Sequence, residues 1–276
     1  MPKPTEEWQA FSDFISCFVA TGWVKGEDAE SLLIVGGPGV GKSTQLDRFV
    51  ELPTVRVVSN ITSDPLRKLV PDAVRRGCYH LLIDEFGRPL SRSRHVADAI
   101  VSAFADMMAG KYGSDYSGPD ASKHLDSGQR FQMGILASLT TEMHSKLCKE
   151  YALTGLLDRV MCLDFSWSKK TRTYIRQNIL SNSSRGAEPI EIDAPDSQKF
   201  PDGVAIYFPS GSTTLLNRLM GELYKGADEG LRNRSTRRVR ALLRAYTWLL
   251  GYDEVYPELF DKFSEDFLRF FKAERI

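Results

Sequence analysis

The sequence predicts an α/β fold in which a five-stranded parallel sheet lies between two layers of helices and is followed by a small α-helical lid domain. Short apolar runs alternate with helical patterns over the first 165 residues, as in parallel sheets with crossover helices. The apolar runs lack in–out alternation, which is expected of strands that are buried on both faces. After Trp167 the composition changes, and only helical patterns follow.

The predicted strands are short aliphatic segments bounded by glycine, polar or charged residues. They are expected at residues 32–35, 55–58, 79–83, 133–139 and 160–165. Helices are predicted where apolar residues recur at helical spacing. They are expected at residues 6–20, 44–52, 64–76, 92–109, 142–151, 213–225, 235–251 and 257–272.

These elements divide the chain into four predicted regions. The first is an N-terminal helix packed on the core, the second the α/β core, the third a connector rich in Ser, Pro, Gly and Asp, and the fourth a helical lid. Their predicted bounds are residues 1–29, 30–167, 168–212 and 213–276.

Composition narrows the class of protein. The 276 residues are 42% hydrophobic and 26% charged, which is ordinary for a globular chain with a sizeable core. A formal net charge of zero excludes a whole-molecule field that attracts nucleic acid or anionic membranes. The four cysteines form no CxxC pair, and no signal core or apolar stretch of membrane-spanning length is present. We therefore expect a cytoplasmic protein with reduced thiols and no membrane partner.

Residues 36–43, GGPGVGKS, fit the phosphate-loop pattern G-x-x-x-x-G-K-[ST]. Glycines let the backbone curl around phosphate oxygens, and the following helix adds its positive end. Lys42 is expected to reach the β- and γ-phosphates, and the Ser43 hydroxyl to bind Mg²⁺. The sequence thus predicts a P-loop fold that binds ATP and Mg²⁺. The predicted nucleotide contacts are Gly36, Gly37, Pro38, Gly39, Val40, Gly41, Lys42, Ser43 and Thr44.

Two adjacent carboxylates, Asp84 and Glu85, end the apolar run of residues 80–83. At the end of a strand both side chains can face the phosphate crevice. In P-loop hydrolases the first acid holds magnesium and the second polarises the attacking water. We expect Asp84 to be a magnesium ligand with Ser43, and Glu85 and Lys42 to be catalytic.

With both motifs in place, the chain resembles an AAA+ ATPase, and most of all the minichromosome-maintenance and MoxR-like branches, over residues 30–165 and 213–270. Residues 134–140, GILASLT, resemble the sensor-1 strand, which ends in a polar residue that faces the γ-phosphate. The resemblance implies that this residue is Thr140, with Ser138 and Thr141 as alternatives.

Residues 155–160, GLLDRV, resemble the family segment whose arginine enters the site of a neighbouring subunit. The resemblance implies that Arg159 is this finger and that the chain forms a homo-oligomer, a ring or a filament. Residues 235–239 resemble the part of the lid that carries a sensor-2 arginine, here Arg237, which would contact the nucleotide. The alternative for Arg159 is a surface or salt-bridged arginine. For Arg237 the alternative is a solvated or ion-paired role, because six arginines crowd together between residues 232 and 244; this cluster could also grip phosphates of ATP or of nucleic acid.

The leading functional hypothesis is an ATPase that couples turnover to remodelling or movement of a macromolecule, namely DNA or a DNA-bound protein. The alternative is an ATP-controlled assembly or switch protein that recruits a replication, transposition or defence partner without motor activity. A small-molecule kinase is a third and weaker hypothesis.

Residues 110–130 form a polar interval between a helix and the sensor-1-like strand. Lys111 and Lys123 would suit a hairpin that touches DNA, whereas the glycines, Pro119 and the acidic residues favour an ordinary surface loop. Both interpretations stay open from the sequence.

Overall fold

The structure is a computed structural model. It describes residues 4–58, 69, 73, 77–110, 132–151, 155–164, 166–181, 188–195, 199, 203–224 and 229–272. The helix predicted at residues 64–76 and the interval at 110–130 lie outside this part of the chain, except for Leu69, Ala73 and Gly110.

A five-stranded, all-parallel sheet forms the centre of the molecule, with the strand order β2-β3-β4-β1-β5, so the predicted sheet is confirmed. The strands are β1 (Ser31–Gly36), β2 (Val55–Val57), β3 (His80–Ile83), β4 (Gly134–Thr140) and β5 (Val160–Asp164). Strand β4 separates β1 from β3. The loops that follow β1 and β3 therefore flank the carboxyl end of β4, which is the edge where ligands bind in open α/β sheets.

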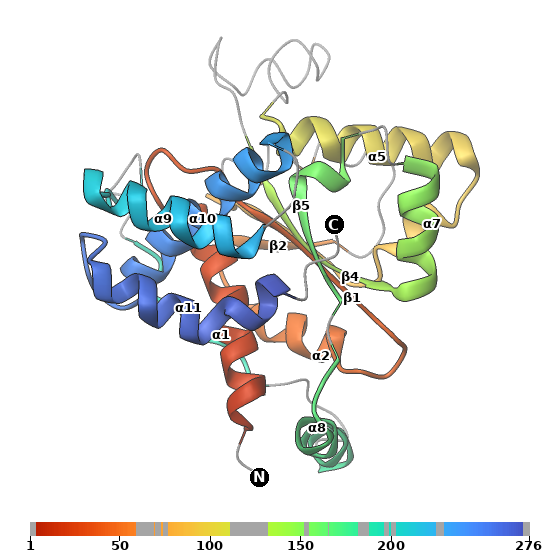
Figure 1. Cartoon of the computed structure of the whole chain (residues 1–276). Coiled ribbons are helices and arrows are strands. Elements are labelled where there is room, and N and C mark those ends of the chain that lie inside the picture. The colour runs from red at the N-terminus through yellow and green to blue at the C-terminus, as the bar shows by residue number, and fades with distance from the viewer. Residues whose placement is uncertain are drawn as a thin grey trace.

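Helices cover both faces of the sheet, which gives the predicted three layers (Figure 1). Alternate residues of β1, β3, β4 and β5 enter different cores: Ile34 packs on one face and Val35 on the other. The first face carries α1 (Glu6–Thr21) and α2 (Lys42–Leu46), and the second carries α4 (Gly87–Leu90), α5 (Arg94–Met108) and α7 (Thr141–Tyr151).

The C-terminal part is helical, with α9 (Ser210–Leu223), α10 (Glu229–Leu249) and α11 (Pro257–Lys272). It packs on α1, which is buried along most of its length. Phe14 of α1 stacks on Phe270 of α11 with ring centroids 4.7 Å apart, and it also contacts Phe267 at 5.2 Å. The aromatic stripe of residues 260–271 is thus core, because its rings interlock with those of α1.

Three differences from the predicted elements have local causes. The helix after the glycine loop starts earlier, at Lys42, and tightens into a 3-10 turn, η1 (Asp47–Phe49). Helix α4 was not predicted, and it holds Pro89 in its first turns, where a missing N–H costs little. Helix α8 (Lys169–Ser181) lies inside the predicted connector.

Helix α8 forms because its first turn is well capped. The Ser168 hydroxyl accepts from the backbone N–H of Thr171 at 3.3 Å, and the Glu7 carboxylate accepts from the backbone N–H of Ser168 at 3.1 Å. Its inner side buries Tyr174 and Ile175. Among the described helices, none combines the length and the apolar character needed to cross a membrane.

Candidate nucleotide and magnesium site

The glycine loop connects the carboxyl end of β1 with the first residue of α2. Gly39 and Gly41 have φ angles of +71° and +80°, which other residues adopt only with strain. A Cβ atom built on Gly37 or Gly39 would meet no described atom within 4 Å, so the loop borders open space there. The backbone thus forms the curled, open cradle that the predicted phosphate contacts require.

Lys42 lies at the centre of this loop. Its Nζ donates to the carbonyl oxygens of Gly36 at 2.9 Å and Gly37 at 2.7 Å. Burial lowers the pKa of the Lys42 ammonium, and the negative charge of Asp84 opposes this shift. The two hydrogen bonds hold the Lys42 ammonium against the loop, where it would attract phosphate oxygens.

Three side chains from three elements converge beside Lys42. The Ser43 hydroxyl of α2 donates at 2.6 Å to Oδ1 of Asp84, the residue directly after β3. The Ser138 hydroxyl of β4 donates to the same oxygen at 3.3 Å. Hydroxyl and carboxylate oxygens are the donors that Mg²⁺ prefers, so Ser43 and Asp84 fit a magnesium ion. These are the two residues predicted to hold it.

Glu85 diverges from Asp84. With φ of +54°, it is the one non-glycine residue in the described ranges that has a left-handed backbone. Its carboxylate forms an ion pair with Arg88 of α4, and more than half of each of these two side chains is exposed. The turn after β3 therefore places the Glu85 carboxylate beside Arg88, whereas the Asp84 carboxylate contacts Ser43. Backbone strain of this kind is often retained at functional sites.

The sensor-1 candidates occupy distinct positions. Ser138 and Thr140 are two residues apart on β4, so their side chains share one face of the sheet. Ser138 is buried and reaches Asp84, whereas Thr140 is exposed and pairs in register with Gly36. The Thr140 hydroxyl accepts from the backbone N–H of Met143 at 3.3 Å, and Thr141 begins α7. Ser138 thus acts on the acid, and Thr140 borders the loop.

The outer side of the cradle rests on a helix that the sequence did not predict. The indole N–H of Trp167, just before α8, donates to the Val40 carbonyl at 2.5 Å. A Cβ built on Gly41 would lie 3.2 Å from Ile175 of α8. The spacing of Trp167, Tyr174 and Ile175 is the helical signal that would have revealed this support.

Arg159 lies at the amino-terminal end of the parallel strands, just before β5, whereas its own phosphate loop lies at their carboxyl-terminal end, just after β1. It ends the 3-10 turn η3 (Leu157–Arg159), immediately before Val160 pairs with Ser31, five residues ahead of Gly36. Five strand residues span about 16 Å. Its guanidinium donates to the Gly155 carbonyl. The side chain is therefore too far from the loop of the same chain for direct contact.

The arginines of α10 are largely ion-paired. Arg234 meets Asp158 at 2.6 Å, Arg238 meets Glu30 at 3.4 Å, and Arg240 and Arg244 share Glu27. These four arginines of the crowded cluster are therefore ion-paired, as one of the interpretations of the cluster predicts. The side chain of Arg232 is outside the described part of the chain.

Arg237 is exposed and lines a hollow of ≈ 500 Å³ with residues of α9. The acids that hold its helical neighbours, Glu30 and Asp158, both precede strands. Arg237 thus lies at the same end of the sheet as Arg159 and away from its own phosphate loop.

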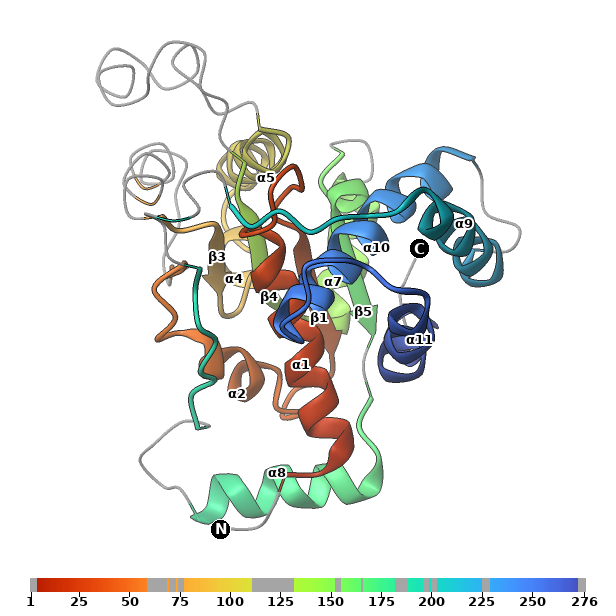
Figure 2. The ribbon, with the colours of Figure 1, turned by 90° about the vertical axis from the view of Figure 1, so that its left-hand side faces the viewer.

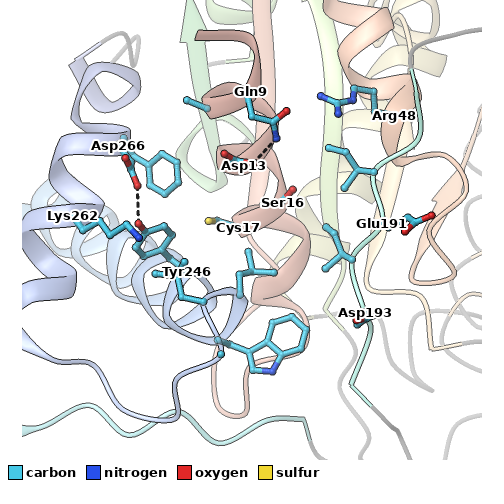
Figure 3. Close-up of a pocket in the computed structure, with 18 of the residues that line it drawn as sticks. Gln9, Asp13, Ser16, Cys17, Arg48, Glu191, Asp193, Tyr246, Lys262 and Asp266 are labelled. Atoms are coloured by element: carbon cyan, nitrogen blue, oxygen red, sulfur yellow. Dashed lines mark hydrogen bonds between the residues drawn. The ribbon is translucent and has the colours of Figure 1, made fainter. Parts of the chain in front are cut away.

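A separate cavity of ≈ 890 Å³ lies between α1, residues 189–193, the end of α10 and α11 (Figure 3). Asp13 accepts from Gln9 at 2.9 Å, and Asp266 accepts from the hydroxyl of Tyr246 at 2.7 Å. None of its described lining residues belongs to the glycine loop or to the acidic pair, so this cavity is distinct from the candidate nucleotide site.

The fold is similar to that of a solved structure, a full-length MCM homolog from Methanopyrus kandleri, with a TM-score of 0.51 and 14% sequence identity. The match covers 100% of this chain and 63% of that chain, so this chain spans less than two thirds of that protein. The sequence matches no family profile. No curated protein matches it in sequence. The likeness is one of fold alone.

Proposed function

We propose that the protein is an AAA+ ATPase that hydrolyses ATP with Mg²⁺ and couples turnover to remodelling or movement of a macromolecule, DNA or a DNA-bound protein. The contact between Ser43 and Asp84 at 2.6 Å carries this proposal. It joins the last residue of the glycine loop to the first acid after β3, the two groups from which a P-loop hydrolase builds its magnesium site.

The residues around this contact have complementary roles. The backbone N–H groups of the glycine loop and Lys42 would hold the phosphates, and Ser43 and Asp84 would hold the ion. Bound magnesium would neutralise the charge of the phosphate oxygens. Glu85 would orient and polarise water once its carboxylate leaves Arg88.

The position of Arg159 supports an oligomer with composite sites. An arginine at the edge of the sheet opposite its own loop can act on a nucleotide only across a subunit interface. Arg237 lies at the same edge and is exposed. An arginine supplied by a neighbour can lower the barrier of phosphoryl transfer by several kcal/mol, equivalent to roughly 10³–10⁵ in rate.

Two measurements test this proposal. Phosphate release from ATP should require Mg²⁺. The rate of release per subunit should increase with protein concentration, because the composite site forms only on assembly. Strand displacement then separates a motor from a switch: a motor displaces DNA in proportion to ATP consumed. Turnover without displacement would favour the alternative, ATP-timed assembly with a partner. Turnover that is independent of protein concentration would contradict composite sites.

A further inference from the structure

Helix α8 presents one continuous cationic face. Lys169, Lys170, Arg172 and Arg176 are all exposed, whereas Thr171, Tyr174 and Ile175 are buried against α1 and the glycine loop. At 100° per residue, the exposed positions fall on one side of the helix. We call these four residues the α8 cationic face. Figure 2 shows α8 along the lower edge of the molecule, away from α9 and α11.

The charge of this face is uncompensated. The segment of residues 169–181 contains no acidic residue. Within the described part of the chain, none of the four cations forms an ion pair, in contrast to the arginines of α10. The nearby carboxylate of Glu7 is already bonded to Ser168 and Thr171. Because the whole chain has no net charge, the face is a local concentration of positive charge.

We propose that the α8 cationic face binds the phosphate backbone of nucleic acid, which names the partner of the ATPase proposed above and rests on that function. Gln177, exposed on the same face, carries an amide donor of the kind that contacts phosphates, whereas the Thr173 hydroxyl donates to the Lys169 carbonyl at 3.0 Å. Residues 169 and 176 are about 10 Å apart along the helix, enough to follow successive phosphates. The face lacks an exposed apolar side chain among these positions, which a membrane-binding helix would need.

The same helix touches the phosphate loop on its inner side. Trp167 donates to the Val40 carbonyl, and Ile175 packs against Gly41. Nucleic acid bound to the outer side of α8 would therefore affect, through the helix, the conformation of the loop that holds the nucleotide. Coupling through such a two-sided element is reciprocal, so DNA should change ATP affinity and ATP should change DNA affinity by the same factor.

The test compares two variants of equal charge. One replaces the α8 cationic face (Lys169, Lys170, Arg172 and Arg176) with Gln, and the other replaces four exposed cations elsewhere (Arg56, Lys146, Lys149 and Arg218) with Gln. Binding of labelled single-stranded and duplex DNA is measured by fluorescence anisotropy at about 50 and 200 mM salt. The α8 variant should bind at least about tenfold more weakly with a shallower salt dependence, and the control should match the parent.

Phosphate release from ATP, measured on the same proteins, keeps this inference distinct from the proposed function. Equal weakening in both variants, or in neither, would overturn the role of α8 and leave the ATPase proposal intact. DNA binding through α8 without ATP turnover would overturn the ATPase proposal alone. A parent protein that binds no DNA, or that binds phosphatidylserine vesicles through the same four residues, would overturn the α8 inference.

A footprint on the parent protein guards against misfolding of the variants. Lysine acetylation with and without DNA, followed by mass spectrometry, should show protection of Lys169 and Lys170 but not of Lys146 and Lys149. Equal acetylation of Lys169 and Lys170 in both conditions would refute contact at this face.

Discussion

The Ser43 hydroxyl lies 2.6 Å from Asp84 Oδ1, although 41 positions separate the two residues in the sequence. The parallel sheet makes this contact possible, because it brings the ends of β1 and β3 to one edge with only β4 between them. Ser138 of β4 fills that gap and donates to the same carboxylate.

Asp84→Asn should abolish the Mg²⁺-dependent part of ATP affinity, because an amide is a poorer magnesium ligand than a carboxylate. Binding of a non-hydrolysable ATP analogue, titrated with and without Mg²⁺, measures this effect. Asp106→Asn on α5 is the matched control and should behave as the parent. Magnesium dependence that persists in Asp84→Asn would place the ion elsewhere.

Glu85→Gln should bind ATP normally and lose turnover by at least about a hundredfold, since an amide cannot accept a proton from water. The bound nucleotide should then trap the assembled state. Arg88→Ala removes the ion-pair partner and should leave the carboxylate competent. Single-turnover phosphate release distinguishes the two variants, and hydrolysis at the parent rate by Glu85→Gln would mean that another base acts.

Ser138→Ala and Thr140→Ala should differ in kind. The first removes a hydrogen bond to Asp84 and should raise the Mg²⁺ concentration required for turnover. The second removes the hydroxyl that accepts from Met143 N and borders Gly36, so it should lower kcat without changing the magnesium requirement. Magnesium titrations of turnover test both variants. Identical profiles would remove the distinction between the two positions.

Two buried groups at the amino edge of the sheet should give stability opposite dependences on pH. Burial raises the pKa of Glu30 to about 7, opposed by Arg238, and burial lowers the pKa of His80 to about 4, opposed by its hydrogen bond to the Glu30 carbonyl. As pH rises from about 4.5 to 6.5, Glu30 makes the free energy of unfolding fall, because the folded chain retains a proton that the unfolded chain loses. Over the same range His80 makes it rise, because only the unfolded chain binds that proton.

His80→Gln should remove the contribution of His80 to the pH dependence and leave that of Glu30. The unfolding free energy of the parent minus that of the variant should increase with pH, by up to about 1.4 kcal/mol per unit, and level off above the ordinary histidine pKa. Urea denaturation across this range measures the difference. Glu30→Gln provides the mirror control, for which the same difference should decrease with pH. Parallel stability curves for the parent and His80→Gln would contradict the assignment.

The sequence alone predicts what local chemistry determines. The glycine loop, the acidic pair and the five strands are encoded in contiguous residues, so their types and approximate bounds follow from pattern. Helix α8 was missed because its exposed cations dilute the apolar signal, and its start depends on Glu7, far away in the chain. The left-handed turn at Glu85 and its pairing with Arg88 leave no periodic trace in the sequence.

The arginines of residues 232–244 illustrate a second limit. Spacing alone indicates a crowded cationic helix. It cannot show that four of these arginines form ion pairs with Glu27, Glu30 and Asp158, which are distant in the sequence. The fold also places Arg159 and Arg237 at the edge opposite the glycine loop, which is a property of tertiary structure. The assignment of both to a neighbouring site stays a prediction.

The most direct test of the central claim, an ATPase whose sites are completed by a second copy, is a mixing experiment. Lys42→Ala and Arg159→Ala should each hydrolyse ATP poorly, the first for lack of a phosphate contact and the second for lack of the arginine. In mixed assemblies, some interfaces pair an intact Lys42 with an intact Arg159 from the neighbour, so phosphate release should rise above that of either variant. Assemblies that are demonstrably mixed but show no gain in phosphate release would contradict the account.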